Sequence, residues 1–295
     1  MTLKDLLERA KKQNRPVFWD GAMGTQLIAR GLGGKVSEFW NLEKPEVIEQ
    51  IHRDYMEAGA EVVQTNTFGG NRIKLKGAGL EDKVQEINRR AGEIAKKAVQ
   101  GKALVAGDIG PTGEMMSPMG SLTPEQAEEV FAEQASALLE GGVDLFSIET
   151  MFDLEEVRSA IRAVKKVAPH FPVVAHMTFR KTSRGFFTMM GVTPKQAISA
   201  MLEEGADLVG ANCTIGPAEM VELVREMRAY TSAPLIAQAN AGSPRLENGK
   251  EVYEFSAQEY AEYAPKIFSA GANAIGACCG STPEFIKLIV EKFIS

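Results

Sequence analysis

The stretch NAIGACCGSTPE, residues 273–284, contains a short apolar run, a polar end and a helix start, in that order. The run Asn273–Ala277 is typical of a buried strand, and Thr282 followed by Pro283 is typical of the first turn of a helix. A strand that leads into a helix is half of the repeating unit of parallel sheets. The stretch therefore predicts an α/β protein, provided that the same order recurs along the chain.

The order does recur. Seven further strand-like runs precede this one: Val17–Trp19, Glu61–Thr65, Ala103–Gly107, Val143–Ile148, Pro172–Ala175, Asp207–Ala211 and Pro234–Ala239. Helical patterns such as Lys83–Val99, Ala127–Leu139 and Met220–Tyr230 lie between them. Eight such units fill the 295 residues, so the sequence predicts one domain, residues 1–295, folded as a (β/α)8 TIM barrel. The alternative, an open doubly wound sheet, usually has a G-x-G-x-x-G turn after its first strand, which is absent here.

Several helix starts and loops can be predicted as well. Thr123–Gln126 and Thr193–Gln196 each offer a Thr N-cap, Pro at the first helical position and Gln at the third, and Ser281–Glu284 looks similar. Long loops are expected over Ile109–Leu122 and Thr178–Val192.

Composition excludes some classes of function. The chain is 44% hydrophobic and 24% charged, and it has no uncharged apolar run long enough to span a membrane. Met1–Arg15 lacks the apolar centre of a secretory signal, so we expect a soluble, cytoplasmic protein. The net charge is −6 and no basic stretch is present, so nucleic acid is not an expected partner.

Polar residues stand where the predicted strands end: Asp20, Asn66, Asp108, Glu149, His176, Cys213, Asn240, Cys278 and Cys279. Active sites of such barrels form at the carboxyl ends of the strands, so these side chains are expected to converge. Taken singly, Asn66, Asp108 and His176 are equally well explained as residues that mark the end of a strand.

The three cysteines share this predicted rim. An odd number with two adjacent is a poor disulfide framework, and a free cysteine can simply be a small buried hydrophobe. Three rim thiolates with one open position fit a catalytic zinc better. Cys278 and Cys279 can reach the same metal only where the strand has ended, and Gly280 permits that bend.

A zinc held by three thiolates has a net charge near −1, which leaves a fourth thiolate nucleophilic and favours alkyl transfer to sulfur. Hydrolytic zinc usually has His or carboxylate ligands, and His52, His170 and His176 show no such spacing. A zinc hydrolase on the same barrel is therefore the less favoured enzyme. A zinc or thiol sensor is the non-enzymatic alternative.

Five blocks of sequence carry a resemblance to a known family. They are residues 20–25 (DGAMGT), 65–68 (TNTF), 107–111 (GDIGP), 212–213 (NC) and 278–283 (CCGSTP). From about Val17 to Ile289 the chain resembles the homocysteine S-methyltransferase domain. Residues 112–114 (TGE), 215–217 (IGP) and 240–244 (NAGSP) are most similar to the homocysteine module of cobalamin-dependent methionine synthase.

The resemblance implies a zinc-dependent methyltransferase that converts homocysteine to methionine. It implies that Cys213, Cys278 and Cys279 bind Zn²⁺, with the homocysteine sulfur as fourth ligand and the oxygen of Asn240 in its place beforehand. It further implies that Asp20 and Glu149 hold the ammonium group. The remaining expected homocysteine contacts are the backbone N–H groups near Gly21 and Ala22, for the carboxylate, together with Asn66 and, as further candidates, Asp108 and His176.

The methyl donor is harder to infer. Relatives that use betaine have an aromatic residue after the glutamate of strand four, where this chain has Thr150, although Trp40 could form one aromatic wall. S-methylmethionine stays open. Corrinoid and folate modules are absent from these residues, so the expected donor is methylcobalamin or a methylated corrinoid on a separate protein. Five methionines after strands three and five could form a docking rim or be ordinary loop residues: Met115, Met116, Met119, Met189 and Met190. A related thiol or selenol as acceptor, the oligomeric state and a longer parent chain also stay open.

Overall fold

The computed structural model describes residues 1–34, 36–247 and 250–294. Within these residues, eight parallel strands form one sheet in the order β1-β12-β9-β8-β5-β4-β3-β2. The strands are β1 (Val17–Phe18), β2 (Val62–Gln64), β3 (Leu104–Ile109), β4 (Leu145–Met151), β5 (Val173–Met177), β8 (Leu208–Asn212), β9 (Leu235–Ala239) and β12 (Ala274–Ala277). Each coincides with one of the eight predicted runs.

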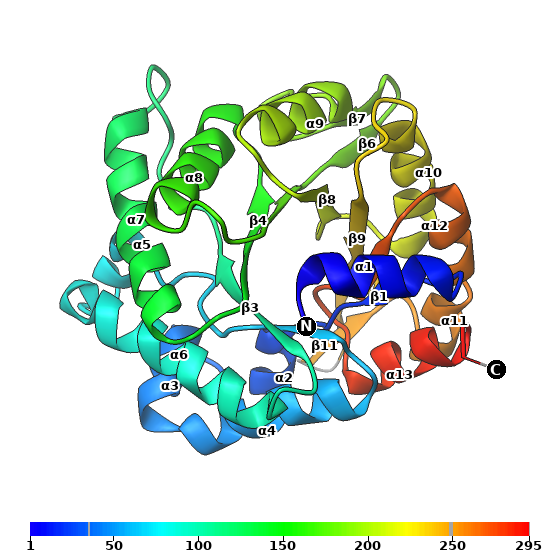
Figure 1. Cartoon of the computed structure of the whole chain (residues 1–295), viewed down its shortest axis with the longest axis horizontal. Coiled ribbons are helices and arrows are strands. Elements are labelled where there is room, and N and C mark those ends of the chain that lie inside the picture. The colour runs from blue at the N-terminus through cyan, green and yellow to red at the C-terminus, as the bar shows by residue number, and fades with distance from the viewer. Residues whose placement is uncertain (35, 248–249, 295) are drawn as a thin grey trace.

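The two ends of the sheet meet and close it into a barrel. Trp19, directly after β1, forms a parallel bridge with Val62 of β2. The Glu61 N–H donates to the Phe18 carbonyl at 2.8 Å, and the Asp20 N–H donates to the Val62 carbonyl at 3.1 Å. Figure 1 shows the resulting ring of strands inside a ring of helices. The predicted (β/α)8 barrel is confirmed, and the open sheet is excluded.

Helices follow the strands around the outside. The longer ones are α4 (Pro45–Glu57), α6 (Val84–Val99), α7 (Pro124–Glu140), α8 (Leu154–Val167), α9 (Pro194–Glu203), α10 (Pro217–Arg228) and α13 (Pro283–Glu291). Shorter helical segments are α2 (Met23–Ala29), α3 (Trp40–Glu43), α5 (Arg72–Lys76), α11 (Ala257–Ala261), α12 (Ala264–Ala270) and the 3-10 turns η1 (Ser37–Phe39) and η2 (Glu81–Lys83). Thr123 and Thr193 form the predicted capping boxes. The third prediction was wrong, because Thr282 caps α13 without a side-chain hydrogen bond and Ser281 donates instead to the Cys278 carbonyl at 2.7 Å.

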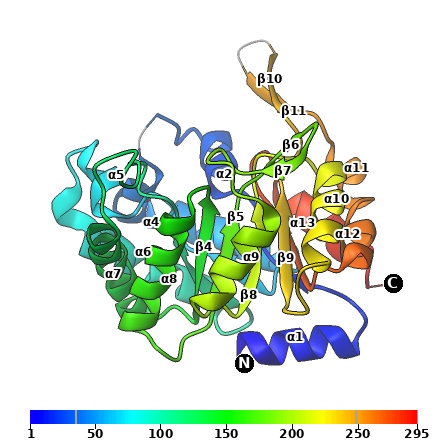
Figure 2. The same cartoon turned by 90° about the horizontal axis from the view of Figure 1, so that it is seen from above.

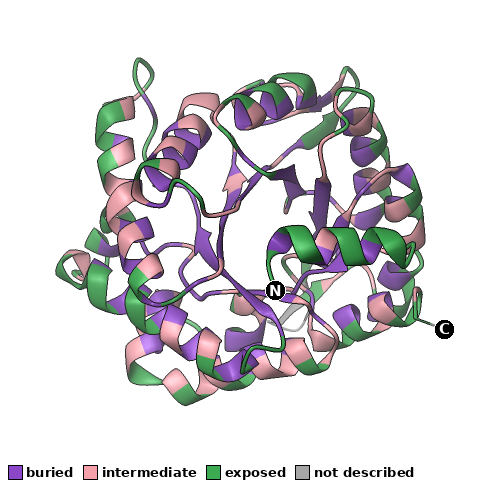
Figure 3. Cartoon of the chain, viewed as in Figure 1, coloured by how far each residue is buried: buried purple, intermediate pink, exposed green. Residues whose placement is uncertain are grey.

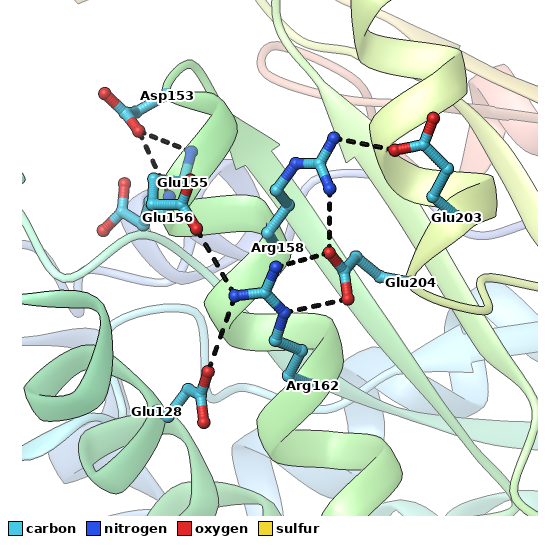
Figure 4. A network of polar contacts seen from close by, with 8 residues as sticks. All are labelled: Glu128, Asp153, Glu155, Glu156, Arg158, Arg162, Glu203 and Glu204. Carbon is cyan, nitrogen blue, oxygen red and sulfur yellow. Dashed lines mark hydrogen bonds and ion pairs between the residues drawn. The ribbon is translucent and has the colours of Figure 1, made fainter.

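Ion pairs join neighbouring helices of the outer ring. Arg162 of α8 donates to both carboxylate oxygens of Glu204, which directly follows α9, at 2.9 and 2.6 Å. Arg158 reaches the same carboxylate and that of Glu203, as Figure 4 shows. These groups are partly exposed, so their main effect is to fix the register between the helices, and their contribution to stability is small.

The barrel interior is filled at its amino-terminal end. Inward-facing residues of every strand form one apolar cluster there with Leu3, Leu6 and Ala10 of α1 (Leu3–Lys12). Figure 2 shows α1 lying across the end of the barrel away from the hairpin of β10 (Pro244–Glu247) and β11 (Lys250–Tyr253). Figure 3 shows buried strands inside helices with exposed outer faces. A larger cluster fills the space between strands and helices. The carboxyl end is the end left for a site.

Two loops at the carboxyl end contain β-hairpins that the sequence did not predict. The predicted loop Thr178–Val192 contains a hairpin, β6 (Arg180–Thr182) and β7 (Gly185–Phe187), and an unpredicted second hairpin, β10 (Pro244–Glu247) and β11 (Lys250–Tyr253), follows β9. Of the five loop methionines that could form a docking rim, Met115, Met119 and Met189 are exposed, whereas Met116 is buried and Met190 half-buried. Among the described helices, none combines the length and apolar character that crossing a membrane requires.

Candidate functional site

A pocket of about 400 Å³ opens at the carboxyl ends of the strands. It brings together most of the predicted site residues: Asp20, Gly21, Ala22, Asn66, Asp108, Glu149, Cys213, Cys278 and Cys279. Gln64, Thr65, Thr150 and Gln238 also line it, as do Met23, Gly24 and Thr25 of α2. Asn240 and His176 are not among its lining residues. Residues up to 259 positions apart (20 to 279) therefore share one cavity.

Unusual backbone conformations place the cysteines. Cys213 follows β8 with φ +59°, and Gly280 follows Cys279 with φ +84°. The Cys213 N–H donates to the Gln238 carbonyl at 2.9 Å, and the Cys278 N–H donates to the Ala239 carbonyl at 2.8 Å, so both turns are tied to β9. A side chain on Gly280 would overlap the Tyr253 ring, which explains why glycine stands there.

The three sulfur atoms lie within 4.8 Å of one another. The Sγ atoms of Cys213 and Cys279 are 3.9 Å apart. A tetrahedral site with Zn–S bonds of about 2.3 Å has S···S edges of about 3.8 Å. Hydrogen bonds from Cys278 and Cys279 lower the pKa of the Cys213 thiol to about 3, so the cluster already stabilises one thiolate. This donor set fits a soft metal ion such as zinc.

Asn240 lies beside the cluster. Its side chain is among the groups that lower the pKa of the Cys213 thiol. Its Oδ1 is buried and has no hydrogen-bond partner among the described residues. A buried amide oxygen without a partner remains able to accept a further contact.

Part of the pocket wall is acidic. Asp20, Asp108 and Glu149 are each at most 9% exposed, and burial raises the pKa of all three carboxyls, that of Glu149 to about 7. Oδ1 of Asp20 and Oδ1 of Asp108 have no hydrogen-bond partner among the described residues. No Lys, Arg or His occurs among the residues described as lining the pocket. Such a wall is suited to a cationic group of a ligand.

The turn before α2 only partly matches its expected role. The Ala22 N–H donates to Ser281 Oγ at 3.0 Å, so it is already engaged. A side chain on Gly21 would come within 2.5 Å of the same hydroxyl, which shows how closely this turn packs on the cysteine turn. No side chain caps α2, so the N–H groups of its first turn, from Met23 onward, remain for an anion.

Asn66 and His176 are less suited to binding a ligand than the cysteines and carboxylates of the pocket. The Asn66 side-chain nitrogen donates to the Ser37 carbonyl at 2.7 Å and to Asn41 Oδ1 at 3.1 Å, so it shapes the pocket wall. His176 is fully buried, neither ring nitrogen has a partner in the described chain, and burial lowers its pKa to about 3. It is therefore neutral and lies outside the pocket lining.

Two amide residues of the site were missed from the sequence. Gln64 Nε2 donates to Glu149 Oε2 at 3.3 Å, and Asn212 Nδ2 donates to the same oxygen at 3.1 Å. The available signal was a polar residue inside a strand: Gln64 lies within the apolar run Glu61–Thr65, and Asn212 precedes Cys213. An amide in the interior of a barrel needs hydrogen-bond partners there, and in this barrel the carboxylate of Glu149 supplies one.

Comparison with known proteins shows which family this chain belongs to. The model of the homocysteine S-methyltransferase family matches residues 17–293, a range that contains every predicted site residue. The chain belongs to this family. Methionine synthases of Mycobacterium leprae and Mycobacterium tuberculosis are each 34% identical to it, over 96% and 92% of its length. The chain spans about a quarter of each of these relatives, 24% in both cases.

Solved structures agree on the architecture. The homocysteine methyltransferase MmuM from Escherichia coli, in its oxidized and its metallated form, superposes with a TM-score of 0.79 at 24% identity, and 97% of this chain and 99% of that chain are covered. The apo form gives a TM-score of 0.73 at 23% identity. At this level of identity the likeness extends to the fold.

Proposed function

We propose that this chain transfers a methyl group to the thiol of homocysteine to give methionine, with zinc bound by Cys213, Cys278 and Cys279. The observation that carries the proposal is the juxtaposition of a three-thiol cluster and an acidic wall in one pocket of about 400 Å³. Homocysteine has a thiol for the first and an ammonium group for the second. Membership of the homocysteine S-methyltransferase family supports the same substrate.

Each side of the pocket then has a role. Asp20 and Glu149 bind the ammonium group, and the first turn of α2, together with Gly21, receives the carboxylate. Asn66 holds the wall between them, Asp108 adds negative charge, and His176 remains a neutral interior residue. Asn240, whose buried Oδ1 has no hydrogen-bond partner among the described residues, would offer that oxygen to the metal before the thiol arrives.

When bound, zinc supplies a positive charge that favours the thiolate of the substrate over its thiol. The three cysteine sulfurs hold that ion, and the pocket walls keep the homocysteine sulfur beside it. The carboxylates fix the far end of the substrate, so its sulfur faces the open mouth of the barrel, from which a methyl donor approaches.

The proposed donor is methylcobalamin or a methylated corrinoid on a separate protein. The support is that the relatives at 34% identity are methionine synthases of which this chain spans about a quarter. S-methylmethionine and betaine are the alternatives, and Thr150 after Glu149 weighs against betaine because it offers no aromatic face. Cytoplasmic localisation remains part of the proposal.

The test is to incubate the zinc-loaded protein with homocysteine and, in separate reactions, methylcobalamin, S-methylmethionine or betaine, and to measure methionine. Methionine formed from methylcobalamin is the expected result. Turnover with S-methylmethionine or betaine alone would contradict the donor and keep the acceptor. Absence of methionine with all three, from protein that contains zinc, would contradict the methyltransferase proposal.

A further inference from the structure

We propose that Gln64 is a positioning residue that aligns both carboxylates of the ammonium site, one through its backbone and one through its side chain. The inference rests on the proposed function and deepens it, because it identifies what sets the geometry of the homocysteine ammonium site. Gln64 is the last residue of β2 and lines the pocket.

Gln64 contacts one oxygen of each carboxylate. Its backbone N–H donates to Asp20 Oδ2 at 2.7 Å, and its side-chain Nε2 donates to Glu149 Oε2 at 3.3 Å. The other oxygen of Asp20, Oδ1, is buried and has no hydrogen-bond partner among the described residues. One residue thus binds one oxygen of each acid and leaves the second oxygen for a ligand.

The carboxylate of Glu149 is likewise hydrogen-bonded, within the described residues, through only one of its oxygens, in this case by two donors. In the described chain, the hydrogen bonds to its carboxylate come from Gln64 Nε2 and Asn212 Nδ2, and both end on Oε2. Its Oε1 is left for the pocket. Two donors on one oxygen restrain its position from two directions and so restrict rotation of the carboxylate more than a single donor would.

The direction of the Gln64 amide is itself fixed. Trp19 Nε1 donates to Gln64 Oε1 at 2.8 Å, and Ser147 Oγ is 3.0 Å from the same oxygen. An indole N–H is a donor only, so the oxygen of Gln64 must face Trp19 and its NH₂ must face Glu149. Trp19 and Ser147 are both fully buried, so this orientation is held by the interior of the barrel.

The consequence concerns selectivity for the ammonium group. Two carboxylates with pre-aligned free oxygens bind an ammonium without first losing rotational freedom, which strengthens binding of that group alone. Loss of the Gln64 amide should weaken the part of the affinity that comes from the ammonium and leave the sulfur contribution unchanged. A purely structural role would reduce both parts together.

The test uses two thiols that differ only in this group. Homocysteine and 4-mercaptobutanoate, which lacks the amino group, are titrated by calorimetry into zinc-loaded wild type and Gln64→Met, a substitution that keeps length and removes the amide. We expect homocysteine affinity to fall roughly three- to tenfold, the range of one orienting hydrogen bond. The affinity for 4-mercaptobutanoate should change less than twofold.

Zinc content and melting temperature are measured on the same samples. If Gln64→Met does not fold, Gln64→Asn takes its place; it keeps an amide that is one methylene too short to reach Glu149, and the same selective loss is expected. An equal loss for both thiols, or unchanged homocysteine affinity, would overturn the role of Gln64. If the wild type itself fails to prefer homocysteine, the ammonium site of the proposed function fails, whatever the variants do.

Discussion

At the scale of single residues, replacing Glu149 gives a direct test of the proposed ammonium site. Glu149 is 9% exposed and lines the pocket, and Asn212 Nδ2 lies between its carboxylate, at 3.1 Å, and the sulfur of Cys278, at 4.0 Å. Glu149→Gln removes the charge that complements the ammonium, and a hydrogen bond to a charged group contributes roughly 1.5–3 kcal/mol. We expect homocysteine affinity to fall about tenfold or more while zinc content stays the same. An unaltered titration curve would rule out this role.

The same carboxyl makes stability depend on pH. Its pKa rises from the ordinary 4.5 to about 7 on folding, chiefly because of burial. Between these values the folded state binds more protons than the unfolded state, so stability falls as pH rises through this window. At pH 8 the free energy of unfolding of Glu149→Gln, obtained from melting curves, should therefore exceed that of the substrate-free wild type by about 3 kcal/mol, whereas at pH 4 the two should differ little. Equal differences at both pH values would contradict this.

Cys213 tests the metal site. Its sulfur is 3.9 Å from that of Cys279 and belongs to the single three-residue cluster of this kind found among the described residues. Cys213→Ser replaces a thiolate by a hydroxyl, a much poorer ligand for a soft metal ion. We expect zinc content to fall from about one per chain to a small fraction, with the circular dichroism spectrum unchanged. Full zinc content in the folded variant would disprove the assignment.

Strand-end residues were the part of the site that the sequence could predict. Asp20, Glu149 and the three cysteines meet as expected because parallel strands end at one face of a barrel. The engagement of the Ala22 N–H by Ser281 was not predictable, since 259 residues separate the two and only the closed barrel brings them together. His176 was ambiguous for another reason: the sequence places it at the end of a predicted strand but does not show how deeply it lies.

At the scale of elements, the turn that follows β12 carries two of the three sulfurs. Gly280 has φ +84°, and an added Cβ would overlap the Tyr253 ring. Gly280→Ala should therefore cost more than about 1 kcal/mol and displace Cys278 and Cys279, lowering zinc affinity more than it lowers the melting temperature. Gly79→Ala, also at positive φ (+67°) but with open space around it, is the matched control and should bind zinc normally. Normal zinc affinity in Gly280→Ala would show that the turn tolerates the change.

Strands that are buried were predicted from the sequence, whereas exposed strands were not. All eight barrel strands were found because they are buried on both faces and give continuous apolar runs. The β6–β7 hairpin was missed because Arg180–Thr182 is exposed and polar, so it gives no hydrophobic pattern. Ser281 was expected to begin a capping box, but its hydroxyl bonds the Cys278 carbonyl and the Ala22 N–H instead.

At the scale of the whole molecule, stability and function lie at opposite ends of the barrel. Leu6 of α1 is 1% exposed and packs into the barrel end away from the pocket. Leu6→Ala should cost roughly 2–5 kcal/mol through the cavity it leaves and lower the melting temperature by several degrees. Homocysteine affinity, measured well below that melting temperature, should not change. A loss of affinity comparable to that of Glu149→Gln would mean that the two ends are coupled.

The pairing of β1 with β12 also determines when the barrel can close during synthesis of the chain. Phe18 pairs with Ile275, a partner 257 residues later in the chain (275 − 18). A ribosome that adds about 5–20 residues per second needs roughly 13–50 s to cover that distance. Throughout that time one edge of β1 is unpaired, the nascent chain carries Cys213 at most, and the pair Cys278 and Cys279 does not yet exist. The proposed zinc site can therefore be completed only after the eighth strand of the barrel and the two cysteines that follow it have been made.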